Sequence, residues 1–183
     1  MIVPRHPQRF DEVAALIESQ GFAVARRSAA GQPTDAEIWL GDSLGEMALY
    51  YGLADVALLG GSFEPLGGQN LIEAAACGCP VVLGPSTFNF AEAADLAVAA
   101  GAALRVQTME QAVRAALSLV GDAVRRDAMV QSAHGFAASN RGAAERTAAA
   151  VLAIAEGASP MPARAATTST AVAPEQRAEP TLD

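Results

Sequence analysis

The order of apolar and polar residues predicts strands and helices that alternate along the chain. Short apolar runs typical of strands occur at 1–3, 22–26, 37–40, 55–60, 80–84 and 102–106. Segments with the spacing of amphipathic helices lie between them, at 8–19, 43–53, 70–77, 89–99 and 108–120. Several strand runs are apolar throughout, which is typical of parallel strands buried on both faces. The pattern therefore predicts an α/β fold with a doubly wound parallel sheet.

Residues at the ends of the helical segments support these boundaries. Ser43 has Glu46 three residues after it, and Thr108 precedes another helical segment, so each supplies a side-chain oxygen for the unpaired amides of a first helical turn. Glycine suits the left-handed position that follows many helices, and it occurs here at Gly21, Gly101 and Gly121.

The C-terminal third differs from the rest. From 122 to 156 the pattern is helical and Ala-rich, with a break near 139–142, so we expect two terminal helices. After Gly157 the composition changes to Ala, Pro, Thr and Ser, which bury too little apolar surface to offset the entropy of ordering. With 183 residues, half of them apolar, the chain is long enough for one domain. We assign that domain to residues 1–156 and a disordered tail to 157–183.

Charge and cysteine content exclude several classes of protein. The net charge of −8 argues against nucleic-acid binding, which uses clustered Lys and Arg. Without a long apolar run or a secretory signal, the chain is expected to be cytoplasmic. Cys77 and Cys79 are too close for an ordinary disulfide and too few for a metal site, so we expect reduced core thiols and no metal.

Glycine-rich loops after the run at 55–60 predict a nucleotide site. Gly60-Gly61-Ser62 would lie at the carboxyl edge of the sheet, where open α/β folds bind ligands. Gly67-Gly68-Gln69-Asn70 leads into a helix whose first amides favour a phosphate, and Glu73 can accept hydrogen bonds from a ribose diol. Glycine pairs also occur in many loops that bind nothing, and the helix dipole alone favours a Glu in a first turn.

The chain from Val3 to about Leu152 resembles the C-terminal half of the 3-deoxy-D-manno-octulosonic acid (Kdo) transferases. The resemblance rests on the stretches VPRHPQRF, GDSLGEMALYYGLADVALLGGSFEPLGGQNLIEAAACGCPVVLGPSTFNFAEAADL and AGAALRV. It implies the Rossmann-like C-terminal domain of a GT-B glycosyltransferase. It also implies an inverting transfer of Kdo from CMP-Kdo to a lipid A precursor, lipid IVA, in lipopolysaccharide biosynthesis at the cytoplasmic face of the inner membrane.

The resemblance also implies which residues contact the donor. Arg5 and His6 match a Pro-Arg-His turn, where the guanidinium can pair with the CMP phosphate or the Kdo carboxylate. The segment near the cytosine, which would open a helix, contributes Leu44, Gly45, Glu46 and Met47. The phosphate and sugar loops contribute Gly60, Gly61, Ser62, Gly67, Gly68, Gln69 and Asn70. Glu73 matches the ribose ligand, and Asn89 matches a position at the cleft rim.

The chain departs from the family pattern in two respects. Gln69 stands where the family commonly has His, so that a neutral amide replaces an imidazole. The family's N-terminal domain, with the proposed catalytic carboxylate and the acceptor site, has no counterpart here, and neither do the first strand and helix of the donor domain. We therefore expect a fragment or an internal start, with no catalytic residue of its own. It would be inactive alone and would reach the membrane only through the absent half. No cofactor is expected, because CMP-Kdo is a substrate.

Two alternatives remain open. Retaining transferases of the glycogen-synthase-like type carry two glutamates with seven residues between them in the donor domain, whereas Glu64 and Glu73 have eight between them. The second alternative is a non-catalytic, truncated module that binds a nucleotide or a partner and exposes a sheet edge. Binding of CMP and CDP in preference to UDP or ADP is expected for the Kdo family and not for the retaining type.

Overall fold

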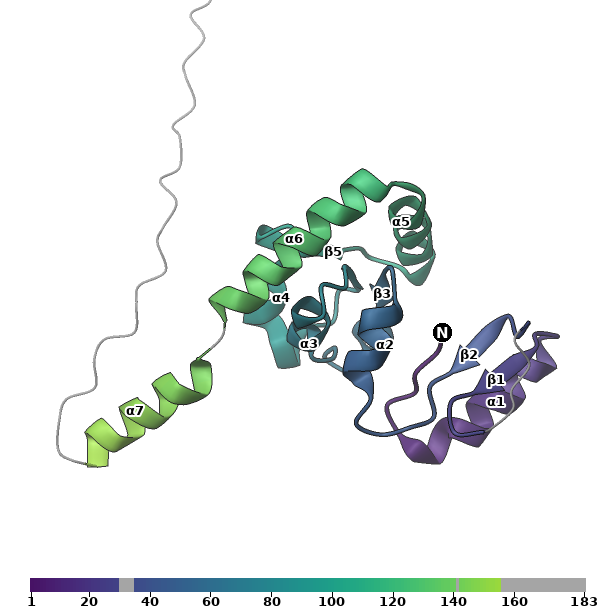
Figure 1. The fold of residues 1–183 in the computed structure, drawn as a ribbon, viewed down its shortest axis with the longest axis horizontal. Coiled ribbons are helices and arrows are strands. Elements are labelled where there is room, and N and C mark those ends of the chain that lie inside the picture. The colour runs from purple at the N-terminus through teal and green to yellow at the C-terminus, as the bar shows by residue number, and fades with distance from the viewer. Residues whose placement is uncertain (30–34, 141, 156–183) are drawn as a thin grey trace, which may run out of the picture. The chain divides into compact units, whose positions relative to one another are not determined.

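The structure, a computed structural model, describes residues 1–29, 35–140 and 142–155 (Figure 1). The chain divides into two compact units, Met1–Arg141 and Gly142–Asp183. The described part of the second unit is one helix, α7 (Ala143–Ala155). The predicted break near 139–142 is confirmed, whereas the tail predicted from 157 lies outside the described residues.

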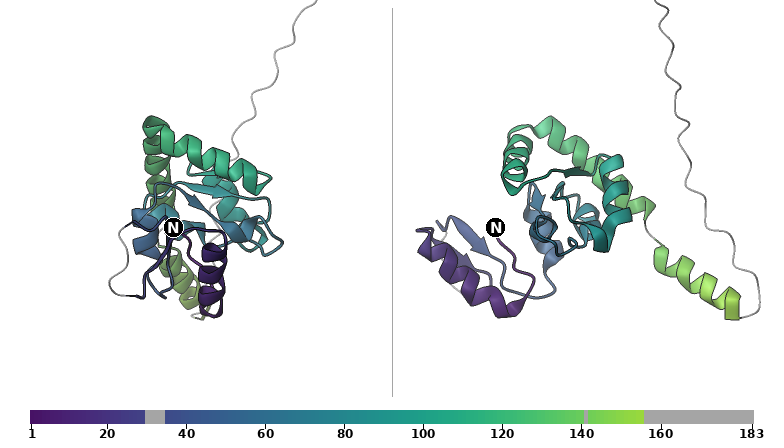
Figure 2. Two further views of the ribbon diagram at one scale, coloured as in Figure 1. Left: turned by 90° about the vertical axis from the view of Figure 1, so that its right-hand side faces the viewer. Right: turned by 180° about the vertical axis from the view of Figure 1, so that it is seen from behind.

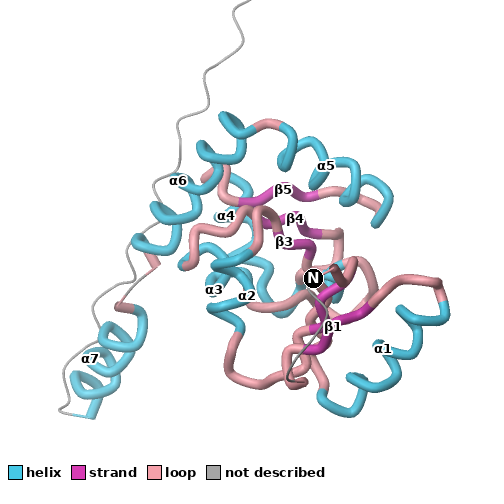
Figure 3. Tube along the Cα trace, turned by 45° about the vertical axis from the view of Figure 1, so that its right-hand side comes forward, coloured by secondary structure: helices cyan, strands magenta, loops and turns pink. Residues whose placement is uncertain are grey.

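The first unit alternates strands and helices as the sequence predicts (Figure 3). Its strands are β1 (Val24–Arg26), β2 (Ile38–Leu40), β3 (Ala57–Leu58), β4 (Val81–Leu83) and β5 (Ala103–Arg105). Its helices are α1 (Phe10–Ser19), α2 (Met47–Leu53), α3 (Leu71–Ala76), α4 (Ala91–Ala99), α5 (Met109–Gly121) and α6 (Ala123–Ser139). Short 3₁₀ turns occur at Pro7–Arg9, Gly60–Ser62 and Phe88–Phe90.

The described strands divide between two parallel sheets. β1 pairs with β2, and Ile2 adds an isolated parallel bridge to Leu40. β3, β4 and β5 form the second sheet in that order. The predicted α/β class and the parallel pairing are confirmed. Among the described residues, however, no pairing joins the Ile2 segment to β3, so the sheet is interrupted there.

Helices cover both faces of the second sheet (Figure 2), and the side chains along β4 alternate between these two faces. Val81 and Leu83 belong to a core cluster with residues of α3, α4 and α6. Val82, between them, belongs to a different cluster with Ala112 and Leu119 of α5. All three β4 side chains are buried. A strand enclosed on both faces explains why the run at 80–84 is apolar throughout.

The first sheet has a smaller core, which it shares with α1. Ala14 and Ile17 of α1 cluster with Leu40 of β2, and Val24 and Ile38 pack against them. Trp39 points to the opposite face of β2, because neighbouring residues of a strand alternate between faces, and it is about half exposed. One face of this sheet is therefore covered while the other presents a large aromatic side chain.

Two of the predicted helix boundaries are wrong. The helix predicted from residue 43 begins at Met47, and Leu44 and Gly45 lie in the loop before it. Glu46 takes the N-cap position without a side-chain cap, and the Ser43 hydroxyl donates to the Glu46 carboxylate instead of accepting from a backbone N–H. Gly121, predicted to follow a helix, is the last residue of α5 and has no positive φ.

Other predicted boundaries are confirmed. Thr108 caps α5, with its hydroxyl oxygen accepting from the N–H of Gln111 at 3.2 Å. Gly21 and Gly101 follow α1 and α4 with φ of +85° and +72°. In this region glycine avoids the steric penalty of a Cβ.

Candidate functional site

Four loops carry the predicted site residues, and each begins where a parallel strand or bridge ends. They follow Ile2, β2, β3 and β4 along the chain. Because the carboxyl ends of parallel strands meet at one edge of a sheet, this is the edge where open α/β folds bind ligands.

The loop after β3 turns at once into the 3₁₀ turn Gly60–Ser62. The Ser62 side chain is fully buried. Its hydroxyl donates to the Leu59 carbonyl and accepts from the N–H of Gly84 at 2.7 Å. Ser62 thus ties the end of β3 to the end of β4, and both functions of its hydroxyl are used within the protein. Its predicted contact with the donor stays a prediction that this inward orientation does not favour.

The second glycine turn is held between the loops that follow β3 and β4. Gly67 and Gly68 both have φ of +79°, which only glycine adopts readily. The N–H of Gly67 donates to the Ser86 hydroxyl and that of Gly68 to the Gly61 carbonyl, each at 3.2 Å. These two amides therefore shape the turn. Among the described residues, no hydrogen bond uses the N–H of Gln69, the next residue.

Asn89 closes this turn from the loop after β4. Its N–H donates to the Gly67 carbonyl at 3.2 Å, and its side-chain Nδ2 donates to the Leu66 carbonyl at 3.1 Å. A Cβ on Gly67 would lie 2.3 Å from that Nδ2, so any other residue at this position would have to displace the Asn89 side chain. Ser86 and Asn89 thus fix the glycine turn. Asn89 was predicted at the cleft rim, whereas Ser86 was missed, although it too follows an apolar strand run.

Asn70 caps α3 and also holds Glu73 of its first turn. The Asn70 Oδ1 accepts from the N–H of Ile72 at 3.1 Å and so caps the helix. Its Nδ2 donates to Glu73 Oε1 at 3.0 Å. Glu73 is exposed, and this hydrogen bond orients its carboxylate. The side chain of Gln69 lies against Gly61, whose hypothetical Cβ would be 3.6 Å from Gln69 Cδ.

The Pro-Arg-His turn lies before α1. Arg5 and His6 are both exposed, and the His6 carbonyl accepts from the N–H of Arg9 at 3.0 Å. Within the described part of the chain, the Arg5 guanidinium has no ion pair or hydrogen bond with another residue. Arg5 is therefore a cation whose charge is available to an anionic ligand.

The loop after β2 is fixed by a buried carboxylate. Asp42 accepts from Arg26 Nε at 2.7 Å, and from the N–H and hydroxyl of Ser28 at 2.8 and 2.6 Å. Burial alone would raise the pKa of Asp42, but the hydrogen bonds from Ser28 and Arg26 outweigh it and hold the pKa below its ordinary value. Sequence reasoning missed this role, although Arg26 ends β1 and Asp42 follows β2, the neighbouring parallel strand.

Glu46, predicted to lie near the cytosine, also has partners inside the protein. It accepts from Ser43 and pairs with Arg27 Nη2 at 2.9 Å. The Ser43 hydrogen bond and the charge of Arg27 lower the pKa of Glu46 despite its partial burial. Leu44 and Gly45, just before it, are exposed, and Gly45 has φ of +78°.

The structure thus places the predicted residues in two groups. One group lies on the loops after β3 and β4 and at the start of α3, where hydrogen bonds join Gly61 to Gly68, Gly67 to Asn89 and Asn70 to Glu73. It comprises Gly60, Gly61, Ser62, Gly67, Gly68, Gln69, Asn70, Glu73 and Asn89. The other comprises Arg5, His6, Leu44, Gly45, Glu46 and Met47. In the described ranges, no hydrogen bond or ion pair joins one group to the other.

Cys77 and Cys79 are free thiols, as predicted, and Cys79 is buried. Among the described residues, no three His, Cys, Asp or Glu side chains are placed to hold a metal ion. No helix in the described ranges is long and apolar enough to cross a membrane.

No protein-family model matches the sequence. The chain is 54% identical over 149 residues to a 3-deoxy-D-manno-octulosonic acid transferase of Bordetella pertussis, and 37% identical over 148 residues to one of Haemophilus influenzae. Each match covers 80% of this chain and 35% of the relative, so the chain spans about a third of the length of these relatives.

A solved structure resembles the described fold. It is the crystal structure of the C-terminal CMP-Kdo binding domain of WaaA from Acinetobacter baumannii, with a TM-score of 0.69 and 33% sequence identity. The match covers 73% of this chain and 72% of that domain. The chain therefore belongs to the 3-deoxy-D-manno-octulosonic acid transferase family and corresponds to part of its C-terminal, GT-B-type domain.

Proposed function

We propose that this chain binds CMP-Kdo and is the donor-binding part of an inverting glycosyltransferase that transfers Kdo to the lipid A precursor lipid IVA. The relatives are named for Kdo transfer, and the similar solved domain is named for CMP-Kdo binding. The observation that carries the proposal is the pair of glycine turns, which Ser62, Ser86 and Asn89 fix at the carboxyl edge of parallel strands.

Individual residues have distinct roles in this proposal. Arg5 pairs with the phosphate or the Kdo carboxylate through its guanidinium. The free N–H of Gln69 donates to a phosphate oxygen, and its side-chain amide both donates and accepts. Glu73, oriented by Asn70, accepts from the ribose hydroxyls.

The chain supports departure of the leaving group and not activation of the acceptor. An acceptor hydroxyl attacks the anomeric carbon of Kdo, its proton passes to a base, and the bond to the CMP phosphate oxygen breaks. Negative charge then grows on that phosphate, where Arg5 and the loop amides stabilise it. The base and the acceptor site belong to the N-terminal domain of the full-length protein, so the isolated chain is inactive. The reaction as written uses neither a metal nor a cofactor.

The test is calorimetric titration of the chain with CMP, CDP, UDP and ADP. CMP and CDP are expected to bind, and Arg5→Ala should weaken CDP binding by roughly tenfold or more, the effect of losing a charge-assisted hydrogen bond. Arg125→Ala is the matched control, since Arg125 is an exposed arginine on α6. Preference for UDP or ADP would contradict the proposal.

A second experiment distinguishes the inverting type of transferase from the retaining type. Glu73→Gln should weaken CMP binding, whereas Glu64→Gln, in an exposed loop residue, should leave it unchanged. Equal losses from both substitutions would instead favour the retaining type with two essential glutamates. Transfer to lipid IVA by the isolated chain would contradict the assignment of the base to another domain.

A further inference from the structure

An ion pair joins the residue after β1 to the loop after β2. The N–H of Arg27, just after β1, donates to the carbonyl of Leu40, the last residue of β2, at 2.9 Å. This bond keeps Arg27 beside the loop that follows β2, where its Nη2 donates to Glu46 Oε1 at 2.9 Å. The Glu46 side chain is 31% exposed and that of Arg27 is 47% exposed, so a ligand can reach both.

Two hydroxyl groups also hold the Glu46 carboxylate in place. The Ser43 hydroxyl donates to Glu46 Oε2, and it shares a second hydrogen bond with the hydroxyl of Tyr50 in α2. The single proton of Ser43 points to the carboxylate, which can only accept, so the Tyr50 hydroxyl is the donor in the second bond. A chain of donors therefore runs from Tyr50 through Ser43 to one oxygen of Glu46, while Arg27 donates to the other oxygen.

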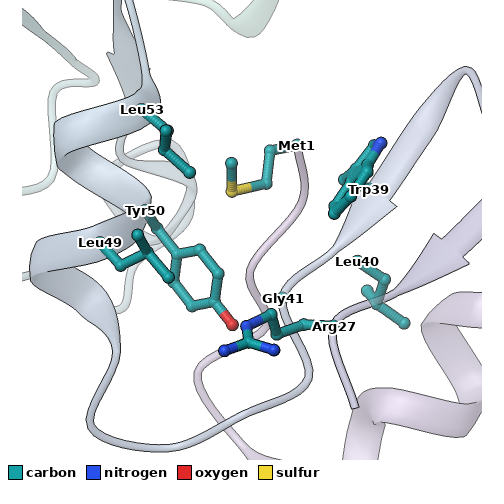
Figure 4. A pocket seen from close by; sticks show the side chains of 8 residues that line it. All are labelled: Met1, Arg27, Trp39, Leu40, Gly41, Leu49, Tyr50 and Leu53. Atoms are coloured by element: carbon teal, nitrogen blue, oxygen red, sulfur yellow. The ribbon is translucent and has the colours of Figure 1, made fainter. Parts of the chain in front are cut away.

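The Tyr50 ring is buried and packs against the backbone just after β2. A Cβ on Gly41 would lie 2.8 Å from Tyr50 Cζ and 2.9 Å from Val3 Cγ2, so the bare backbone of Gly41 lets the ring approach. Figure 4 shows the Tyr50 hydroxyl beside Gly41, pointing toward the Arg27 guanidinium. The packing of the ring therefore fixes the hydroxyl, and the hydroxyl fixes the loop that carries Glu46.

The pair of Glu46 and Arg27 differs from the other charged groups near these strand ends. Arg5 is a cation with no ion pair among the described residues, which suits a phosphate, and Asp42 is buried and held within the protein. The pair has no net charge. A carboxylate has roughly four acceptor sites, more than its partners here occupy, and the guanidinium keeps N–H donors that bond to no described residue. The pair therefore suits a neutral group that presents a donor beside an acceptor.

We propose that this pair recognises the base of the nucleotide and selects cytosine over uracil, an inference that rests on the proposed binding of CMP-Kdo. Cytosine presents its 4-amino donor beside the acceptor N3, so Glu46 accepts from the amino group while Arg27 donates to N3. Uracil presents a carbonyl acceptor beside an N–H donor, so each protein group would face a group of its own kind. Tyr50 is a positioning residue, because it acts on the base only through Ser43 and Glu46.

The test is calorimetric titration of the chain with CDP and with UDP, and the quantity compared is the ratio of the two affinities. Glu46→Gln should lower the preference for CDP by about tenfold or more, because an amide can either accept or donate and so accommodates both bases. Tyr50→Phe keeps the ring against Gly41 and should lower the preference by roughly threefold, because Glu46 is then held less firmly. Glu110→Gln is the matched control. Glu110 forms an exposed ion pair with Arg114 at 2.8 Å in α5, and its loss should change neither affinity by more than about twofold.

The affinity ratio separates base recognition from a structural role. A general loss of the fold or of the site would lower both affinities by the same factor, as Arg5→Ala should by weakening the phosphate contact. If the parent chain prefers CDP and either Glu46→Gln or Tyr50→Phe leaves that preference unchanged, the inference is overturned while the proposed function stands. A parent chain that does not prefer CDP would overturn both, so the two failures are distinguishable.

Discussion

Replacing Ser62 with alanine separates a structural role from a ligand role at the end of β3. The hydroxyl accepts from the buried N–H of Gly84 and donates to the buried Leu59 carbonyl. The Leu59 carbonyl keeps a second donor, the N–H of Ser62 at 3.0 Å, so losing its hydrogen bond from the hydroxyl costs only about 1 kcal/mol. The N–H of Gly84 loses its acceptor in a buried site, which costs about 1–3 kcal/mol. The free energy of unfolding should therefore fall by about 2–4 kcal/mol.

Urea unfolding, followed by circular dichroism, measures this loss, and a thermal scan should show a midpoint lower by roughly 5–15 °C. Ser118→Ala, at an exposed serine on α5, is the control and should change stability by less than about 0.5 kcal/mol. CMP affinity of the folded variant should stay within about threefold, because the hydroxyl points inward. A variant as stable as the parent chain that loses CMP binding would refute this reasoning and make Ser62 a ligand.

Three further predictions follow from the same structure. The pKa of Asp42 in the folded protein lies below its ordinary value, so the carboxylate stabilises the fold at pH values above that ordinary pKa. This contribution is lost as the pH falls through the folded pKa. In urea unfolding from pH 7 to pH 3, the free energy of unfolding should therefore decline less in Asp42→Asn than in the parent chain. Burial raises the pKa of the Cys79 thiol to about 12, so iodoacetamide should label Cys77 first and Cys79 only in urea, as peptide mass spectrometry would show. Gly67→Ala should lower the free energy of unfolding by about 1 kcal/mol or more and should also lower CMP affinity, because φ at this position is +79° and the new Cβ would displace Asn89. A variant unchanged in both measurements would contradict the conclusion that this turn requires glycine.

The sequence was sufficient to predict the strands and helices that the spacing of their own apolar residues determines. The apolar run at 80–84 is β4, enclosed on both faces, and the spacing at 108–120 is α5, capped by Thr108. In each case the residues that determine the element lie within it or next to it. The glycine turns were also predictable, because a left-handed backbone at Gly67 and Gly68 requires glycine itself.

The partners of polar side chains were not predictable, because they come from distant segments. Ser62 bonds to Gly84, and Asp42 to Arg26 and Ser28, in both cases across a parallel crossover. A motif shows that a serine or carboxylate lies at the strand edge, and the structure shows whether it faces the ligand or a neighbouring loop. For this reason the free guanidinium of Arg5 is a stronger candidate for an anion than the hydroxyl of Ser62.

The interruption between the two sheets could not be predicted either, but for a different physical reason. Apolar runs at 1–3 and 55–60 show that both strands prefer to be buried, but an apolar pattern does not say which strand lies beside which. Pairing is decided by the backbone groups of a neighbour, and the Ile2 segment has that neighbour on one side only. Trp39 illustrates this: it lies in an apolar run, yet it is about half exposed, because it points to the face of β2 opposite the core shared with α1.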